Sequence, residues 1–85
     1  MAKTYFVLGA KWHDKVNGNT YFNAKVYDGE TGNCLFYTGY QYGYGSQYAY
    51  EARKMLVERV GNEDFKLVDL GALTMKKHDV KNGWF

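Results

Sequence analysis

The residues best placed to do chemistry lie between positions 38 and 50, ahead of a helix-forming segment. These thirteen residues include five tyrosines and three glycines. Glycine admits positive φ or a close backbone approach, and tyrosine offers a flat apolar face with a polar tip. The combination indicates a contact surface rather than a core segment.

One chemistry for this segment is the binding of a nucleotide-like ligand. A helix N-terminus favours an anion such as phosphate, because its first N–H groups are unpaired and its dipole is positive there. Tyrosine rings could stack on a base, and a glutamine could bond its edge. The segment lacks the lysine of a P-loop and the glycine spacing of a dinucleotide fold. The predicted ligand-binding residues are Tyr40, Gln41, Tyr42, Gly43, Tyr44, Gly45, Ser46 and Gln47.

Three other interpretations of the segment remain open. The tyrosines could be rigid anchors of an inhibitor that docks on a host protein. They could instead pack the loop onto a sheet, with the glycines only turning the chain. A single-stranded nucleic-acid module would use an open sheet face and a basic patch formed where the tail pairs beside the first strand. That patch would consist of Lys11, Lys15, Lys25, Lys76, Lys77 and Lys81.

No combination of side chains indicates catalysis or metal binding. His13 and His78 each have an aspartate beside them, but adjacent residues in a strand point to opposite faces, so neither pair forms a dyad. Cys34 is expected to be a small buried hydrophobe. One cysteine and two distant histidines match no metal-ligand spacing. We therefore expect a protein that is not an enzyme and needs no cofactor or metal.

Composition predicts one small folded domain spanning residues 1–85. The hydrophobic fraction is 46% and the aromatic fraction 19%, which excludes a disordered chain. A single cysteine fits a reducing compartment, and the N-terminal apolar run is too short for a signal peptide or membrane span. The net charge of +2 is too small for a duplex-DNA binder driven by charge. The expected location is the cytoplasm.

The elements that position the segment follow from apolar periodicity. Alternation predicts strands at residues 4–12, 20–28 and 65–70, and a short run of strand-forming residues after a turn predicts another at 34–38. A two-residue type I′ turn is expected at Asn17-Gly18. A helix should begin after Ser46, whose hydroxyl would cap it, and end at Gly61. The fold class is therefore α+β, an antiparallel sheet in the order β-β-β-α-β with one helix packed on one face.

Two parts of this fold are left open by the sequence. The sheet face without a helix would carry either one set of alternate residues or the opposite set, and the more polar set is expected to face water. That set is Tyr5, Val7, Lys11, Tyr21, Lys25 and Tyr27. The tail would form a short fifth strand or part of a partner surface, such as that of a homodimer. In either case Trp84 and Phe85 are expected to be ordered, because burial of two large aromatics is favourable.

The central phrase also supports a resemblance. Its sequence is Tyr42-Gly43-Tyr44-Gly45-Ser46-Gln47-Tyr48. It resembles a Tyr-Gly-Tyr-Gly-Asp/Ser-Gln-Tyr phrase that precedes a helix in small uncharacterised proteins encoded by bacteriophages. The similarity covers the middle half of the chain, and that family has no activity to transfer. It implies a phage accessory protein that counteracts a host defence pathway in the host cytoplasm.

Overall fold

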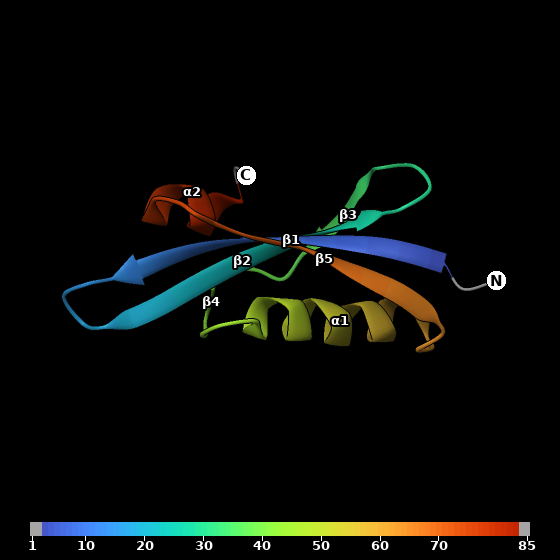
Figure 1. Ribbon diagram of the computed structural model, residues 1–85, viewed down its shortest axis with the longest axis horizontal. Helices are drawn as coiled ribbons and strands as arrows, with labels where there is room; N and C mark the ends of the chain where they lie inside the picture. The colour runs from blue at the N-terminus through green and yellow to red at the C-terminus, as the bar shows by residue number, and fades with distance from the viewer. Residues whose placement is uncertain (1–2, 84–85) are drawn as a thin grey trace.

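A computed structural model describes residues 3–83 and shows a five-stranded sheet with helices on both faces (Figure 1). The strand order is β3-β2-β1-β5, and β4 also pairs with β2. The fold class α+β predicted from the sequence is confirmed. The elements are β1 (Lys3–Asp14), β2 (Asn19–Asp28), β3 (Cys34–Tyr37), β4 (Gln41–Tyr42), α1 (Gln47–Val60), β5 (Phe65–Thr74) and α2 (Lys77–Asn82).

The sheet is mixed, so the prediction of an antiparallel sheet is wrong in one respect. The pairs β1–β2, β2–β3 and β2–β4 are antiparallel, whereas β5 runs parallel to β1 with Phe65 opposite Lys3. The reason is the length of α1, because fourteen residues span about 21 Å. The helix carries the chain back to the end of the sheet where β1 starts, and β5 must then run in the same direction as β1.

The turn between β1 and β2 also differs from the prediction. It is a loop of residues 15–18, and among residues 3–83 only glycines have positive φ, including Gly18 at +69°. Asn17 therefore does not adopt the type I′ conformation. The loop is held instead by the Asp14 carboxylate. Its Oδ1 accepts from the Val16 amide at 3.0 Å, and its Oδ2 accepts from the Asn17 side chain at 2.8 Å.

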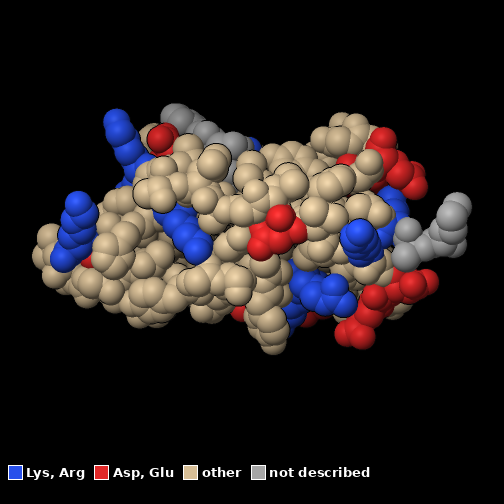
Figure 2. Space-filling model, viewed as in Figure 1, with Lys and Arg blue, Asp and Glu red and all other residues tan. Residues whose placement is uncertain are grey.

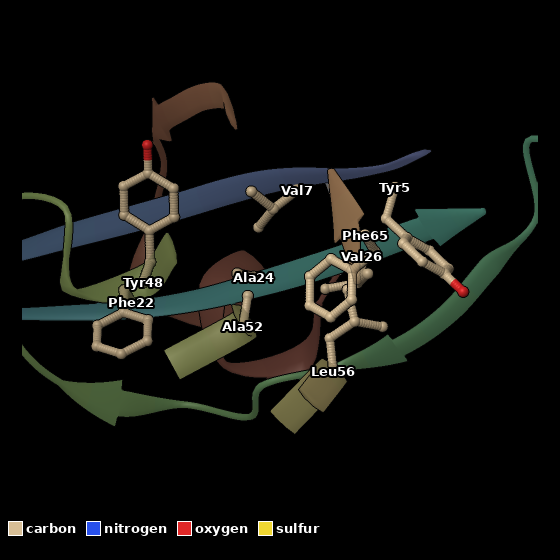
Figure 3. Packing of buried hydrophobic residues seen from close by; sticks show 9 residues of the cluster. All are labelled: Tyr5, Val7, Phe22, Ala24, Val26, Tyr48, Ala52, Leu56 and Phe65. Carbon is tan, nitrogen blue, oxygen red and sulfur yellow. The ribbon is translucent and has the colours of Figure 1, made fainter. Parts of the chain in front are cut away.

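The core lies between α1 and one face of the sheet (Figure 3). In the antiparallel register each odd-numbered residue of β1 is opposite an even-numbered residue of β2, as Val7 is opposite Val26. Cross-strand partners share a face, so odd positions of β1 and even positions of β2 point together toward α1. The core residues are Tyr5, Val7, Phe22, Ala24, Val26, Tyr48, Ala52, Leu56 and Phe65.

The prediction of which residues share the open face of the sheet was therefore wrong. Tyr5 is 5% exposed and Val7 is fully buried, both under α1. Tyr21 and Tyr27 lie on the other face, because their neighbours on β2 point toward the helix. Alternation within each strand was predicted correctly, but matching the two strands to one another requires the pairing between them.

Helix α1 has the boundaries that its sequence predicts. Tyr48, Ala52 and Leu56 are its buried residues, and Gly61 ends it at φ +86° with its N–H donating to the Val57 carbonyl at 2.8 Å. The hydroxyl of Ser46 makes no capping hydrogen bond, which is contrary to the prediction.

The tail forms α2 rather than a strand, and it covers part of the face opposite α1 (Figure 1). Val80 is fully buried there, and the side-chain amide of Asn23 donates to its carbonyl at 2.9 Å. The fifth strand is β4, inside the tyrosine segment. Strand β5 continues past Gly71, whose φ of +95° accommodates a bulge opposite β1. Trp84 and Phe85 lie outside the described residues.

Candidate aromatic contact surface

Five aromatic side chains form a connected row on the sheet face opposite α1. Trp12 stacks with Tyr21, with ring centroids 5.7 Å apart, and Tyr21 stacks with Tyr40 at 5.2 Å. Tyr42 contacts Tyr21 edge to face at 5.8 Å, and Tyr44 contacts Tyr42 in the same way at 5.4 Å. We call Trp12, Tyr21, Tyr40, Tyr42 and Tyr44 the aromatic ridge.

Strand pairing places the members of the aromatic ridge beside one another. Trp12 on β1 is directly opposite Tyr21 on β2, and Tyr21 is opposite Tyr42 on the short strand β4. Direct cross-strand partners have Cβ atoms about 5 Å apart, which is close enough for rings to touch. The three rings therefore meet because three strands are in register at this end of the sheet.

The glycines of the segment have backbone roles. Gly39 and Gly45 have φ of +87° and +58°, which other residues rarely adopt. Gly43 is buried, and a Cβ there would lie 2.6 Å from Cε2 of Phe22. Its amide donates to the Thr20 carbonyl at 3.0 Å, which holds the chain against β2. The interpretation that the glycines turn and pack the loop is therefore supported.

The outer tyrosines are held in place but remain half exposed. The Tyr42 hydroxyl donates to that of Tyr44 at 3.0 Å, and the Tyr44 hydroxyl donates to the Gly18 carbonyl at 3.0 Å. Tyr42 is 52% exposed and Tyr44 is 50% exposed, whereas Tyr40 is partly buried. Two of the three tyrosines are thus at the surface, as expected, and that they face a ligand stays a prediction.

The surroundings of two ridge phenols, Tyr42 and Tyr40, favour their neutral form. The hydrogen bond to Tyr44 raises the pKa of Tyr42 above its usual value of 10.0. Burial raises the pKa of Tyr40 in the same direction. The O–H groups of Tyr42 and Tyr44 already donate to Tyr44 and to Gly18, so toward a partner their oxygens are acceptors, for example of backbone N–H groups.

The two halves of the predicted nucleotide site are on different sides of the sheet. Ser46 lines a shallow hollow of about 260 Å³ between α1 and β5, together with Val7, Ala49, Tyr50, Arg53, Leu67 and Asp69. Tyr40 and Tyr42 instead contact Tyr21 on the opposite face. The structure therefore brings the tyrosines together but does not place Ser46 with them.

The N-terminus of α1 offers few free donors. The Gln47 amide donates to the Tyr44 carbonyl at 3.1 Å, and the Ala49 amide donates to the Ser46 carbonyl at 3.0 Å. Lys11 donates to the Gly45 carbonyl. The Gln47 side chain is exposed, and that of Gln41 donates to the Thr38 carbonyl at 2.7 Å.

The predicted basic residues do not form one patch. Lys11 faces α1, with its ammonium 5.1 Å from the Tyr48 ring centre, whereas Lys25 and Lys77 lie over Tyr37 and Trp12 on the other face. Lys77 belongs to α2, as does the exposed Lys81, and Lys76 precedes that helix. Figure 2 shows positive and negative side chains interspersed over the face that it draws. The register of β1 and β2 is the reason, because it points Lys11 toward α1 and Lys25 toward the opposite face, where the tail helix α2 lies.

The remaining reactive side chains are dispersed. Cys34 is exposed, contrary to the expectation of burial, because it opens the edge strand β3. His13 shares a hydrogen bond of 2.9 Å with the Thr20 hydroxyl. Residues 3–83 contain no group of three or more side chains suited to a metal ion. Within the same residues, neither helix has the length and apolar character needed to cross a membrane.

Comparison with known proteins adds no assignment, since no family model, curated protein or solved structure matches the chain. The sequence analysis missed Trp12 as part of the candidate site, and it expected Tyr21 on an open sheet face without joining it to the tyrosines of residues 40–44. Trp12 and Tyr21 are cross-strand neighbours because they are symmetric about the observed loop of residues 15–18, whereas a two-residue turn at Asn17-Gly18 would have placed Asn23 opposite Trp12. This pairing depends on the register of the hairpin, and the sequence predicted its turn incorrectly.

Proposed function

We propose that the protein is a non-catalytic binding module that docks on a partner protein through the aromatic ridge. The observation that carries this proposal is the unbroken series of ring contacts ending in two half-exposed tyrosines. Rings held by neighbours lose little conformational entropy on binding, and tyrosine is enriched among the anchors of protein interfaces. The resemblance to phage-encoded proteins is our reason for proposing a host protein as the partner.

A nucleotide-like ligand has less support from the geometry. The ridge tyrosines could receive a base, but Ser46 lies across the sheet from them. The hollow beside Ser46 is lined by both Asp69 and Arg53, whose opposite charges give it no net charge to attract a phosphate. A ligand of this class would have to bind on the ridge alone.

Single-stranded nucleic acid is the second candidate, and the position of two lysines favours it. Lys25 and Lys77 lie on the same face as the ridge, and the Lys77 ammonium is 5.4 Å from the Trp12 ring centre. Against this, Tyr21 has its two faces against Trp12 and Tyr40, with interplanar angles of 23° and 8°. Base stacking needs free ring faces, so the ridge offers mainly the faces of Tyr42 and Tyr44.

The proposal is tested by site-specific photocrosslinking. A photoreactive phenylalanine analogue replaces Tyr42 in one sample and Tyr44 in a second. In a third it replaces Tyr50, a control on α1 that is 66% exposed and away from the ridge. Host proteins captured at both ridge positions but not at the control are identified, purified and titrated against the unmodified protein.

Tyr42→Ala and Tyr44→Ala should each weaken binding of the purified partner by about 1–3 kcal/mol, roughly five- to 150-fold. Tyr50→Ala should leave the affinity unchanged, and all three variants should melt near the parent temperature. Equal loss of affinity in the control, or none in the ridge variants, would contradict the proposal.

The competing ligand classes are tested with defined probes. Fluorescein-labelled oligothymidylate and oligouridylate report nucleic-acid binding, which should weaken steeply as salt is raised. Mass spectrometry of the denatured protein, with absorbance near 260 nm, reports a copurified nucleotide. If an oligonucleotide or a copurified nucleotide binds tightly, and if Tyr42→Ala loses that binding, then that ligand and not a partner protein occupies the ridge.

A further inference from the structure

The loop between β1 and β2 forms one end of the molecule, and we call its residues 15–18 the hairpin tip. The molecule measures 47 × 20 × 17 Å along its principal axes. Figure 1 shows β1 and β2 carrying the hairpin tip past the ends of α1 and α2 along the longest axis. Val16 in the tip is 91% exposed, whereas Tyr50, the next most exposed large apolar side chain of the described residues, is 66% exposed. The hairpin tip therefore holds an aliphatic side chain in water.

The conformation of the hairpin tip gives no reason for a valine. Loops favour glycine for positive φ, and asparagine or aspartate for hydrogen bonds to nearby backbone groups. Here Gly18 supplies the positive φ, and the side chains of Asp14 and Asn17 supply the hydrogen bonds. Valine is branched at Cβ and favours strands. Single exposed apolar residues are common on proteins, so the exposure of Val16 matters only together with the way in which it is held.

Hydrogen bonds hold the backbone on both sides of Val16. Oδ1 of Asp14 accepts from the Val16 amide at 3.0 Å and from the Asn17 amide at 3.3 Å. The Gly18 amide donates to the Asp14 carbonyl at 2.8 Å. The Gly18 carbonyl accepts from the Tyr44 hydroxyl at 3.0 Å, which ties the hairpin tip to the aromatic ridge. Val16 therefore has a fixed position relative to the exposed tyrosines, and ordering it in a complex costs little entropy.

We propose that the hairpin tip enters a cleft of the partner protein, where Val16 fills an apolar pocket and Tyr42 and Tyr44 contact the rim. This inference rests on the proposed function and adds the shape and chemistry of the partner's site. A side chain that is exposed on nearly all sides is enclosed only by a concave surface, since a flat surface covers one side of it. The residues that contribute most to binding at protein interfaces fill such pockets.

The chemistry of the hairpin tip and the ridge also defines the rim of the cleft. The hydroxyls of Tyr42 and Tyr44 donate within the chain, so the rim must supply N–H or O–H donors to their oxygens. A valine offers neither a ring on which a base could stack nor a charge for a phosphate. Its place at the tip therefore favours a protein over a single-stranded nucleic acid.

Nitrogen-15 relaxation of the free protein tests whether Val16 is held. Backbone order parameters of Val16 and Asn17 should be about 0.85, the value of a rigid backbone, and equal to those of β1 and β2. Values below about 0.6 in the hairpin tip would overturn the proposal, because a mobile valine is not a preformed anchor. This measurement needs no partner, so its failure leaves the function proposed for the ridge standing.

Titration of the host protein captured and purified through Tyr42 and Tyr44 tests the pocket. Val16→Ala removes two methyl groups from a buried anchor and should weaken binding roughly 15-fold. Val16→Asp places a charge in an apolar pocket and should weaken binding more than about a hundredfold. Val60→Ala is the matched control at the end of α1, where the side chain is 37% exposed, and should leave the affinity unchanged. All three variants should melt near the parent temperature.

The outcomes separate this inference from the proposed function. If Tyr42→Ala weakens binding and Val16→Asp does not, the ridge is the contact surface and the pocket for Val16 is wrong. If neither variant weakens binding, or if no host protein is captured through Tyr42 and Tyr44, both proposals fall. Tight binding of fluorescein-labelled oligothymidylate that Val16→Asp abolishes would also overturn the inference, because the tip would then contact nucleic acid.

Discussion

Replacing Tyr48 with phenylalanine should destabilise the protein and remove a pH-dependent part of its stability. The Tyr48 ring is 5% exposed, and its hydroxyl donates to Asp69, at 2.8 Å from Oδ1 and 2.9 Å from Oδ2. Phenylalanine keeps the ring, so no cavity opens and the loss is one hydrogen bond to a charged acceptor. Such bonds contribute about 1.5–3 kcal/mol. Asp69 is exposed to water, so we expect a loss near the lower end of that range.

The contact between Tyr48 and Asp69 also makes the stability of the fold depend on pH. Burial, followed by the hydrogen bond to Asp69, raises the pKa of Tyr48 from 10.0 to about 12. The folded state therefore holds the phenolic proton more tightly than the unfolded state. The resulting stability is complete below pH 10 and is lost as the pH rises from 10 to about 12. Two pKa units correspond to at most about 2.7 kcal/mol, and water around Asp69 reduces this.

Urea unfolding of the parent and of Tyr48→Phe, followed by circular dichroism at several pH values from about 8 to about 12, measures this difference. Burial also raises the pKa of Tyr27 and of Tyr40. These groups titrate in both proteins, so they cancel when the two free energies of unfolding are subtracted. The difference should shrink steadily above pH 10. A difference that stays constant across this range would refute the assignment of the raised pKa to Tyr48.

Two further predictions concern the fold. Gly43→Ala should destabilise by about 1–3 kcal/mol, because its methyl would meet the Phe22 ring, which is 1% exposed. Thermal melting checks this, with Gly45→Asn as a milder control at φ +58°, and an unchanged melting temperature for Gly43→Ala would contradict it. The Asp28 carboxyl has a lowered pKa, chiefly because the Glu30 amide donates to it, so its stabilisation is present above pH 3.8 and fades below that value. Asp28→Asn should therefore melt below the parent at neutral pH and approach it in acid, and a gap that widens in acid would contradict this.

The parts of the fold that depend on local sequence could be predicted. Residues 46–61 contain an apolar stripe, a terminal glycine and polar residues on the other side, and the observed α1 (Gln47–Val60) lies between Ser46 and Gly61. Strands β1 and β2 were recognised from alternation, and β3 from a short run of strand-forming residues after a turn. A helix stripe or a strand alternation is a property of neighbours in the chain, so the sequence contains it directly.

Properties that depend on distant pairing could not be predicted. The direction of β5, the face occupied by Tyr5 and the separation of Ser46 from the tyrosines all follow from which strands pair and in which register. A one-residue change in register moves every side chain of a strand to the other face. The tail was also missed, since α2 is six residues long and is held by Val80 and Asn23 rather than by a strong local pattern.

The glycines and tyrosines of the central segment have different explanations in this structure. Gly39 and Gly45 have positive φ and Gly43 lacks room for a methyl group, so the fold accounts for these glycines without any ligand. Tyr42 and Tyr44 each leave about half of their surface in water, so burial in the core does not account for them. Two hydrogen bonds nevertheless fix their positions. Exposed rings that are held in place are what a preorganised contact surface requires, because little entropy remains to be lost when a partner binds.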